Sequence, residues 1–573
     1  MKKFTADFET CTWLEDETYV WAWALCDIDN PDNIQIGTDI DSFFKLCCKY
    51  KNSKIYFHNL KFDGSFLISY LIEQGYTLIK DRSEATEKSF YPVISDLGAF
   101  YTITVYIKKY KTKVEKITFI DSLKIINFSV KDIAKTFDLP ISKLEIDYNQ
   151  FRPRDYQLTE EEKDYIKNDV KIVALALGQL FNEHLTKSTA AANALGYYKE
   201  ITGKERFEHF FPQLSYEVDS LIRPAYRGGF TYLNPIYKDK VQKNVYVLDV
   251  NSLYPSCMLK PMPIGTPVFF EGKYKENKLY PLYIQTIMCS FKIKKNKIPT
   301  IQIKDKNLFF APNEYVEDSD GEEFILTLTN IDLEMFLDHY EITSEIDYLG
   351  GYMFRATEGL FDNYINYWTE QKIKAGKEGN KGKRQIAKLQ LNSLYGKFAK
   401  STKTRSKYPV MGKDGLIHYE LGDPKKEDGI YIPVAAFITS YRRQRTIGTS
   451  QAIKDYSIEK YGKDMYIYSD TDSIHTTLPI EECKKFCEID DYKLGYWAHE
   501  ATAEKGLFIR QKCYLEQIDG KMKITCAGLP ERCYDQVTWD NFKEGFTAHG
   551  KLTYKQVKGG VKLVETDFTI KEG

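Results

Sequence analysis

The sequence lacks the features of secreted and membrane-spanning proteins. Its 11 cysteines are scattered and form no Cys-x-x-Cys pair, which argues against both a disulfide framework and a zinc site. No run of about 18 uncharged apolar residues occurs, so we expect no transmembrane helix. The N-terminus reaches the charge of Asp7 before any apolar segment typical of a signal peptide begins. We therefore expect a soluble protein with reduced thiols that stays inside the cell.

The chain also lacks an excess of charge of either sign. Its formal net charge is -1, so overall electrostatics gives no argument for a nucleic-acid partner. Its 573 residues are enough for two or more domains with substantial cores. The 43 Tyr and 34 Phe suit stacking on bases and ordinary core packing equally well, so they decide nothing. Evidence for function must come from local motifs.

The most informative segment is residues 465–475. An apolar run, the sequence Ser-Asp-Thr-Asp and a second strand-forming run predict a β-hairpin with Asp470 and Asp472 at its tip. Side chains two residues apart on extended backbone point the same way. Two clustered carboxylates repel each other unless a cation lies between them, and Mg²⁺ takes oxygen ligands beside substrate phosphates. A solvated turn is the alternative interpretation of this segment alone.

Further acidic residues occur in the N-terminal part. Alternation over residues 4–10 predicts a strand with Asp7 and Glu9 on one face. Residues 54–57 predict another strand, and an apolar helical run begins soon after, so Asp63 falls at a strand-to-helix junction. Taken singly, each of these acids is better explained as a structural residue, either paired or solvated.

A third acidic segment lies on a predicted helix. Residues 159–162 form a capping box, which favours a helix that continues to about residue 177. Tyr165 and Asp169 are four residues apart on this helix and therefore share a face.

In this order the acidic segments resemble the proofreading 3'-5' exonuclease domain, which carries four acids and a tyrosine. The resemblance implies that Asp7, Glu9, Asp63 and Asp169 hold two metal ions about 3.5 to 4 Å apart, while Tyr165 orients the attacking water. It also implies that Lys143 contacts the scissile phosphate. Glu145 is a further candidate metal ligand, although a solvated side chain is the simpler interpretation. The implied contacts to the single-stranded 3' end are Thr10, Tyr56, His58, Asn59, Phe62, Phe66, Ser122, Leu123 and Phe128.

The pattern changes near residue 188. Gly228 and Gly229 let backbone amides approach a phosphate chain closely, or they form a plain turn. Residues 244–250 predict a buried strand that contains Asp249, followed by a turn over residues 251–255. A lone carboxylate that closes an apolar strand is costly unless it has a partner, and Asp470 and Asp472 of the predicted hairpin are the obvious residues to form a constellation with it.

A strongly basic window lies in the middle of this near-neutral chain. Between residues 372 and 407 there are 12 Lys or Arg against one acid. Residues 384–397 predict a helix on which Lys388, Asn392 and Tyr395 form one stripe. Such a stripe suits gripping a triphosphate and packing a nucleobase, whereas a solvated basic helix is the alternative.

Motifs A, B and C of family B DNA polymerases resemble three segments of the chain: Asp249-x-x-Ser252-Leu253-Tyr254-Pro255, Lys388-x-x-x-Asn392-Ser393-x-Tyr395-Gly396 and Tyr468-x-Asp470-Thr471-Asp472-Ser473. Two further motifs of the family are similar to Tyr226-x-Gly228-Gly229 and Lys512-x-Tyr514. The resemblance runs from about residue 4 to residue 514. The compact length resembles the protein-primed bacteriophage subgroup of the small Bacillus-phage kind.

The resemblance implies a DNA-dependent DNA polymerase that replicates a linear phage genome. It implies protein-primed initiation, processive strand-displacing synthesis and 3'-5' proofreading. It also implies two Mg²⁺ ions per active site, with Mn²⁺ able to substitute. The implied metal ligands of the polymerase site are Asp249, Asp472 and the carbonyl of Val250, with Asp470 in support. The implied nucleotide contacts are Tyr254, Lys372, Lys388, Asn392, Tyr395 and Val250, and the implied DNA contacts are Tyr226, Gly228, Gly229, Ser252, Lys512 and Tyr514.

The resemblance implies that Tyr254 stacks beneath the incoming sugar and excludes a 2' hydroxyl. It also implies that Lys372 and Lys388 hold the triphosphate, that Tyr395 lines the nascent base pair and that Lys512 supports the primer terminus. A basic loop from Lys374 to Lys383 is expected to be longer than is usual for the family.

The implied fold is an α/β and α+β multidomain protein: an RNase H-like 3'-5' exonuclease domain followed by a right-hand polymerase. Separations of 143 residues from Asp249 to Asn392 and 78 from Asn392 to Asp470 leave room for two terminal-protein-region insertions. The expected domains are the exonuclease domain (1–188), palm (189–260 and 432–528), terminal protein region 1 (261–358), fingers (359–398), terminal protein region 2 (399–431) and thumb (529–573).

The implied partners are primer-template DNA, single-stranded DNA, dNTPs and a phage terminal protein that serves as primer. A monomer or a heterodimer with the terminal protein, in the host bacterial cytoplasm and away from membranes, is expected. A stand-alone exonuclease leaves motifs A, B and C unexplained. A non-enzymatic DNA-binding module has no use for seven metal-suited acids, and primer extension distinguishes it from a polymerase.

Overall fold

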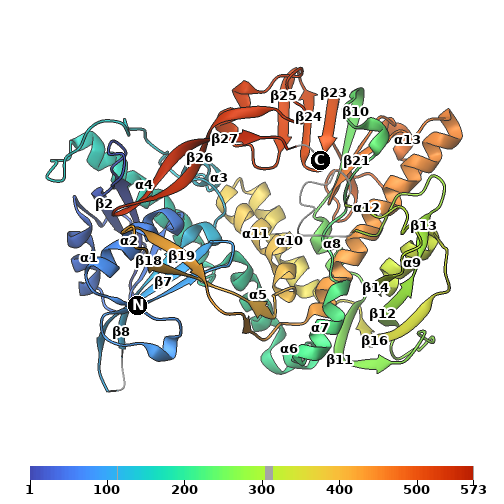
Figure 1. Cartoon of the computed structure of the whole chain (residues 1–573), viewed down its shortest axis with the longest axis horizontal. Coiled ribbons are helices and arrows are strands. Elements are labelled where there is room, and N and C mark those ends of the chain that lie inside the picture. Colours follow the sequence, from blue (N-terminus) through green and yellow to red (C-terminus); the bar gives the residue numbers. More distant parts are fainter. Residues whose placement is uncertain (112–113, 303–313, 572–573) are drawn as a thin grey trace.

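The structure is a computed structural model that describes residues 1–111, 114–302 and 314–571. The remaining residues, which include 303–313 of the expected terminal protein region 1, lie outside the described residues. The chain forms several packed units, with the N-terminal unit at one end of the long axis and the palm sheet toward the other (Figure 1). Among the described helices, none has both the length and the apolar character that a bilayer span requires.

The N-terminal unit is an eight-stranded sheet flanked by helices. Its elements are β1 (Lys3–Thr10), β2 (Val20–Asp27), β3 (Ile34–Gly37), α1 (Ile40–Lys49), β4 (Lys54–Phe57), α2 (Leu60–Glu73), β5 (Thr77–Leu78), β6 (Ser89–Ile94), β7 (Phe100–Lys109), β8 (Val114–Asp121), α3 (Val130–Thr136) and α4 (Glu160–Asn182). The strand order is β3-β2-β1-β4-β8-β7-β6-β5, with β1 parallel to β4. The predicted strand over residues 4–10 and the capping box of α4 are confirmed.

Three short helices lead from this unit into a second sheet. They are α5 (Ala190–Thr202), α6 (Lys204–Phe210) and α7 (Tyr216–Ile222). The sheet and its helices consist of β9 (Thr231–Leu233), β10 (Val241–Val250), α8 (Leu253–Met258), α12 (Ile432–Tyr461), β21 (Tyr466–Asp470), β22 (Ser473–Thr476), α13 (Ile480–Cys483), β23 (Trp497–Arg510), β24 (Cys513–Ile518) and β25 (Lys521–Cys526).

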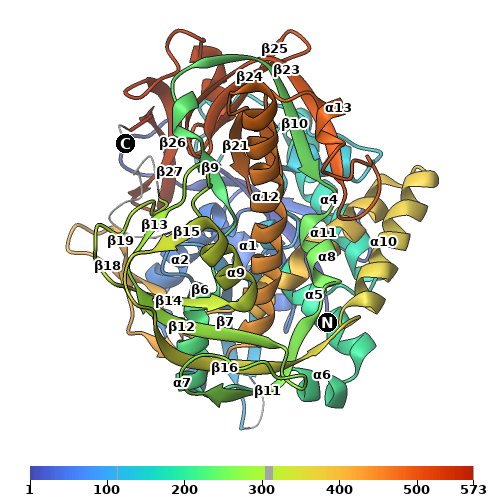
Figure 2. The same ribbon diagram turned by 90° about the vertical axis from the view of Figure 1, so that its right-hand side faces the viewer.

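The order of this palm sheet is β25-β24-β23-β10-β22-β21-β9. β10 is central, between β23 and the predicted hairpin β21–β22, which is confirmed. The long helix α12 runs along the palm and packs on β21 and β22 (Figure 2). The expected turn over residues 251–255 is wrong in extent, because α8 begins at Leu253 and proline is tolerated in the first turn of a helix.

A second small unit is inserted after the first palm strands. It comprises β11 (Met262–Phe270), β12 (Leu282–Cys289), β13 (Phe291–Ile293), β14 (Phe324–Thr329), α9 (Asn330–His339), β15 (Tyr340–Ile342) and β16 (Asp347–Thr357). Four strands form a sheet in the order β11-β16-β12-β14, and β13 pairs with β15. This unit packs on α12 through α9 and β11.

Two helices, α10 (Asp362–Lys377) and α11 (Lys381–Phe398), form a hairpin that carries eight of the 12 basic residues of the basic window. The expected loop from residue 374 to 383 is wrong, because only residues 378–380 separate the helices. Gly379 takes a left-handed φ of 68° that ends α10, and the Asn380 side chain accepts from the Lys383 amide to begin α11. These eight basic side chains therefore lie on helices, whereas Lys400, Lys403, Arg405 and Lys407 follow α11.

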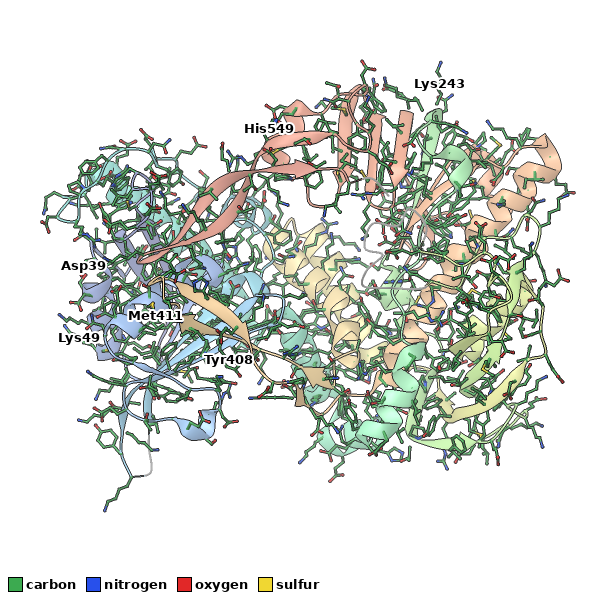
Figure 3. The ribbon with its side chains drawn as sticks, viewed as in Figure 1. Asp39, Lys49, Lys243, Tyr408, Met411 and His549 are labelled. Carbon is green, nitrogen blue, oxygen red and sulfur yellow. The ribbon has the colours of Figure 1, made fainter. Side chains whose placement is uncertain are left out.

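Two β-hairpins join the palm side of the molecule to the N-terminal unit. The first consists of β17 (Lys403–Thr404), β18 (Lys407–Met411), β19 (Ile417–Leu421) and β20 (Lys425–Lys426), and β18 contacts β6. Tyr408 and Met411 of β18 lie beside that unit (Figure 3). The second consists of β26 (Thr547–Val557) and β27 (Gly560–Thr569), which reaches α2.

The second hairpin makes close contacts at its far end. Asn59 donates to the Tyr554 hydroxyl at 2.9 Å, and the Thr18 amide donates to the Lys558 carbonyl at 2.9 Å. A Cβ at Gly560 would meet the Phe66 ring at 2.8 Å, so only glycine lets the two surfaces approach this closely. The first hairpin also touches the second through β19 and β26.

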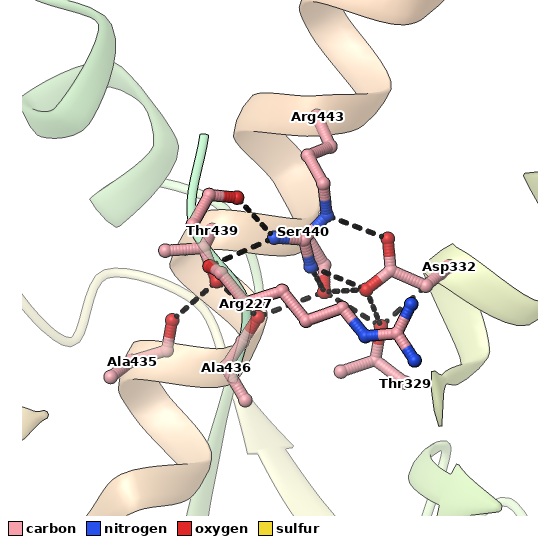
Figure 4. Close-up of polar contacts among 9 residues, drawn as sticks. Arg227, Thr329, Asp332, Ala435, Ala436, Thr439, Ser440 and Arg443 are labelled. Atoms are coloured by element: carbon pink, nitrogen blue, oxygen red, sulfur yellow. Dashed lines mark hydrogen bonds and ion pairs between the residues drawn. The ribbon is translucent and has the colours of Figure 1, made fainter. Parts of the chain in front are cut away.

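A buried ion pair fastens the inserted unit to the palm helix (Figure 4). Arg443 of α12 donates to both carboxylate oxygens of Asp332 on α9, at 3.0 and 2.5 Å. Its Nη1 donates to the carbonyls of Arg227 and Gly228 at 3.0 and 2.9 Å. Burial would raise the pKa of Asp332, but Arg443 and then Arg227 outweigh it and hold this pKa below its ordinary value. One guanidinium thus joins three segments that are far apart in the sequence.

We expect Asp332→Asn to lower the free energy of unfolding by about 3–5 kcal/mol, because it leaves the Arg443 guanidinium buried without its counter-charge. Asp338→Asn on the same helix is the matched control. Asp338 is 61% exposed and pairs with Lys297, so its loss should cost at most about 1 kcal/mol. Chemical denaturation followed by tryptophan fluorescence measures both values. Equal losses for the two variants would contradict the assignment.

Candidate active sites for nucleotide transfer and hydrolysis

The first site lies where the centre of the palm sheet meets the hairpin tip. Asp249 of β10 is paired in register with Ser473, and the Val250 amide donates to the Asp472 carbonyl at 2.9 Å. Thr471 has a φ of 65°, which turns the chain sharply between the two hairpin acids. Asp249 and Asp472 consequently line one cavity of about 860 Å³. Asp470 joins them around a smaller adjoining cavity.

Burial and mutual repulsion make the ionised forms of Asp249 and Asp472 unfavourable, and a cation between them would stabilise these forms. Burial, followed by the charge of Asp472, raises the pKa of Asp249 to about 7. Burial also raises the pKa of Asp472, against opposition from its backbone hydrogen bond and from Arg442. Asp470 is less isolated, because Thr231 donates to it at 3.1 Å and the Lys512 ammonium lies 3.6 Å away. Asp470 thus has a hydroxyl donor and a nearby cation.

The opposite wall of the large cavity is cationic. The predicted Lys372, Lys388 and Asn392 line it, and the cavity also includes Lys381 and Arg384. Burial lowers the pKa of Lys372, and the nearby charges of Arg384 and Lys388 lower it further. Such a converging set suits a polyanion such as a triphosphate. Lys381 and Arg384 were not predicted individually, although both fall in the basic window.

Tyr254 and Tyr395 lie together in this site. Tyr254 lines the cavity beside Val250 and Ser252, and its ring stacks on Tyr395 with centroids 3.8 Å apart and planes 18° apart. The two predicted nucleotide contacts from motifs A and B are thus brought into direct contact.

The remaining predicted polymerase contacts lie around the site in different ways. Gly228 accepts from Arg443, and Gly229 lies against Arg442 and Thr471. Lys512 and Tyr514 line the smaller cavity. Half-buried Tyr226 packs beside Tyr395.

The second site lies in the N-terminal unit. Asp7 and Glu9 come from β1, Asp63 from the first turn of α2, and Asp169 from α4. Burial, then Asp169, raises the pKa of Asp7 to about 7, and burial followed by Asp7 raises the pKa values of Glu9 and Asp63. The charges of the four acids therefore affect one another, so the structure brings these side chains together.

Lys143 and Tyr165 complete this second site. The Lys143 ammonium lies 2.7 Å from Asp169 Oδ2, and the Tyr165 hydroxyl contacts the hydroxyl of Tyr148. Among the described residues, the buried Asp169 Oδ1 has no hydrogen-bond partner. Tyr148 was not predicted; its only signal is its place five residues after Lys143. Glu145 is exposed, as expected for a solvated side chain.

Both acid sets fit divalent metal ions by their chemistry. Their donors are carboxylate oxygens and a backbone carbonyl, the ligands preferred by Mg²⁺, and the orphaned Asp169 oxygen is available to a cation. In the described residues no three such side chains are already gathered into a metal cage. Like charges repel, so the acids converge fully only around cations.

The predicted contacts to a single strand are only partly accessible. Thr10 ends β1, and His58, Asn59, Phe62, Leu123 and Phe128 surround the start of α2 with partly exposed side chains. His58 contacts Ser122 Oγ and the Phe128 carbonyl at 2.9 and 2.6 Å. The Oδ1 atom of Asp121 accepts hydrogen bonds from the amides of Asn59 and Leu60 and so anchors this turn.

Three of these predicted strand contacts are buried in the structure. Tyr56 and Phe66 are each 1% exposed, Tyr56 against Phe181 and Phe66 beneath the hairpin at Gly560, and Ser122 is fully buried. In this conformation their side chains serve packing, and contact with a strand requires their neighbours to move. Sequence alone gave no sign of what covers them.

The palm holds two acids in a cavity that is also lined by cations, and the N-terminal sheet holds a second acidic site. These two sites define the class of protein: a nucleic-acid polymerase with a separate hydrolytic unit. The family described as DNA polymerase type B, organellar and viral, matches residues 45–488, and the chain belongs to this family.

The DNA polymerases of several phages are similar over the whole chain. That of Bacillus phage M2 is 42% identical and that of Bacillus phage phi29 is 40% identical, each over 100% of this chain and 100% and 99% of theirs. The Streptococcus phage Cp-1 enzyme is 34% identical over 99% of this chain and 98% of its own. Phi29 DNA polymerase complexed with primer-template DNA matches with a TM-score of 0.91 at 38% identity, covering 100% of both chains. The predicted fold, an exonuclease domain followed by a right-hand polymerase, is confirmed.

We expect Mg²⁺ to stabilise the protein more at about pH 8 than at about pH 6. The raised pKa values of Asp249 and Asp7, about 7, mean that these folded carboxylates lose their protons, and gain metal affinity, as pH rises through 7. Because folding favours their protonated forms, stability without metal falls as pH rises from about 4 to about 7, and a bound cation restores it.

Thermal melting with and without Mg²⁺ at both pH values measures this difference. Asp249→Asn and Asp7→Asn should each remove part of the pH-dependent Mg²⁺ shift. A shift of equal size at the two pH values would show that these acids do not bind the ion.

Proposed function

We propose that this protein is a phage replicative DNA polymerase that starts on a terminal protein, displaces the non-template strand and proofreads its product. The observation that carries the proposal is the meeting of Asp249 and Asp472 in one cavity with a cationic wall opposite. Full-length similarity to phage DNA polymerases supports it. The expected domain boundaries are proposed with it.

In the polymerase site, two Mg²⁺ ions would be held by Asp249, Asp472 and the Val250 carbonyl, where they would supply charge neutralisation and a more acidic primer 3' hydroxyl. Lys372, Lys388 and their basic neighbours bind the triphosphate and keep it in line. Tyr254, braced by Tyr395, supports the sugar and leaves no room for a 2' hydroxyl. Lys512, beside Asp470, supports the primer terminus.

In the N-terminal site, Asp7, Glu9, Asp63 and Asp169 would hold the second pair of ions. Tyr165 orients the water, and Lys143, already beside Asp169, contacts the scissile phosphate. The accessible residues around the start of α2 hold the unpaired 3' end. Deep burial of these acids suits a site that admits only a frayed strand.

The two hairpins that reach the N-terminal unit suggest how DNA is retained. The hairpin at residues 403–426 and the C-terminal hairpin touch both that unit and each other. We assign them to terminal protein region 2 and the thumb. Together they surround the duplex, so that synthesis needs no separate clamp or helicase.

The partners proposed for this chain are primer-template DNA, single-stranded DNA, dNTPs and the terminal protein, in the host bacterial cytoplasm. Solved phi29 polymerase structures contain primer-template DNA, single-stranded DNA and incoming nucleotides. This supports the DNA and nucleotide partners; the terminal protein is proposed from the subgroup alone.

We expect Asp472→Ala to reduce primer extension by at least about 10³-fold while leaving degradation of a single-stranded primer near the wild-type rate. Asp7→Ala should show the reverse. Each variant is the other's control, because the acids belong to different sheets. Extension and degradation of one labelled primer with Mg²⁺ measure both activities. Loss of both extension and degradation in one folded variant would contradict the assignment of the two activities to separate sites.

We expect a covalent nucleotide adduct on a Ser, Thr or Tyr hydroxyl when the protein, Mg²⁺ and labelled dNTPs meet the terminal protein of its own phage. The Asp472→Ala variant supplies the negative control. Primer extension without any adduct would contradict protein-primed initiation and indicate an ordinary primer-dependent polymerase. A minicircle template separately tests displacement, for which products longer than the circle are expected.

A further inference from the structure

Arg442 of α12 is a buried cation at the polymerase site that none of the motifs includes. It is 3% exposed, and within the described part of the chain its Nε and Nη1 have no hydrogen-bond partner. The next residue, Arg443, donates to Asp332, Ser440 and two backbone carbonyls. Leaving buried donors unpaired is costly. The position of Arg442 therefore calls for another cause.

That cause is the ring of Tyr254. The guanidinium carbon of Arg442 lies 4.3 Å from the centroid of this ring. Tyr395 stacks on the same ring at 3.8 Å and nearly parallel, so it covers one face and leaves the other to the guanidinium. Tyr254 is thus held between an aromatic ring from α11 and a cation from α12. A desolvated cation over a ring is attracted more strongly than an exposed one.

Gly229 provides the space for this arrangement. A Cβ at this position would lie 2.1 Å from Nη2 of Arg442 and 2.9 Å from Thr471 Oγ1. No other residue leaves room for the guanidinium. The second glycine of the Tyr226-x-Gly228-Gly229 motif is therefore needed for packing in this chain, whether or not its amide approaches a phosphate.

The acidic groups around Arg442 help to keep its guanidinium protonated. Burial, then Arg443, lowers its pKa to about 10, while Asp472, Tyr226 and Asp470 act in the opposite direction. The side chain therefore remains a cation at neutral pH. It lies against the Tyr254 ring and is not among the residues that line the large cavity.

We propose that Arg442 is a positioning residue that clamps Tyr254 against Tyr395 and thereby sets the discrimination between deoxyribonucleotides and ribonucleotides. The proposal rests on the proposed function of Tyr254 beneath the incoming sugar. Without the cation, one face of the ring loses its partner and the ring gains freedom to tilt. A 2' hydroxyl then finds room, and the sugar of a dNTP is less firmly supported.

The test is a double-mutant cycle between Arg442→Met and Tyr254→Val, scored as the ratio of kcat/KM for dNTP to that for rNTP. Methionine fills much of the same space without a charge. In the wild-type background we expect Arg442→Met to lower the ratio on the order of tenfold, the range of a buried cation-π contact. The dNTP part of this change should appear as a higher KM with little change in kcat. In the Tyr254→Val background the same change should have almost no effect.

Arg442→Lys retains the charge without the planar group and should fall between wild type and Arg442→Met; it carries the test if the methionine variant does not fold. Lys460→Ala removes a charge from the exposed end of α12 and should leave the ratio unchanged. Degradation of single-stranded DNA by the N-terminal site shows that each variant is folded.

The outcomes separate this inference from the function on which it rests. If Tyr254→Val leaves discrimination unchanged, the sugar role of Tyr254 is wrong. If Tyr254→Val lowers it but Arg442→Met does not, or lowers it equally in both backgrounds, the clamp is wrong. An equal change in Mg²⁺ dependence in both backgrounds would also overturn the clamp, because the charge would then act on the metal ligands directly.

Discussion

The repulsion between Asp249 and Asp472 is the constraint around which the palm is built. Antiparallel pairing of β10 with β22 brings the end of one strand to the turn of a distant hairpin, and burial raises the pKa of both acids. Two ionised carboxylates at such a place are unfavourable without cations. The sheet must therefore hold them firmly, and the cost is offset only when metal ions and a phosphorylated substrate arrive.

The two active sites solve this problem differently. In the N-terminal unit a built-in cation, Lys143, lies against Asp169, and the acids are enclosed by β1, α2 and α4. In the palm, Arg442 of α12 lies near Asp472, but the four cations of the α10–α11 hairpin that line the large cavity, Lys372, Lys381, Arg384 and Lys388, belong to a separate unit. A site with its own lysine suits hydrolysis of one bond in a confined strand. Cations on separate helices suit a triphosphate that enters, reacts and leaves.

Long-range contacts connect the sites into one molecule. Arg443 joins the inserted unit, the palm helix and the segment at Gly228, and Arg442 beside it braces Tyr254. The hairpins at residues 403–426 and 547–569 carry the palm side of the chain to the exonuclease unit. The two adjacent arginines of α12 thus have different partners. Arg443 binds the Asp332 carboxylate and two backbone carbonyls, whereas Arg442 packs on the Tyr254 ring.

The sequence by itself determined the hairpin at Asp470, the strand ending near Asp249, the capped helix with Tyr165 and Asp169 and the basic helix, because periodicity, capping and turn chemistry are local. Ordered motifs also determined the family. Only the tertiary structure decided which side chains are covered: Tyr56, Phe66 and Ser122 are buried by elements distant in the chain. It also decided that Arg442 meets Tyr254. Such contacts join residues that are far apart in sequence, and no local pattern records them.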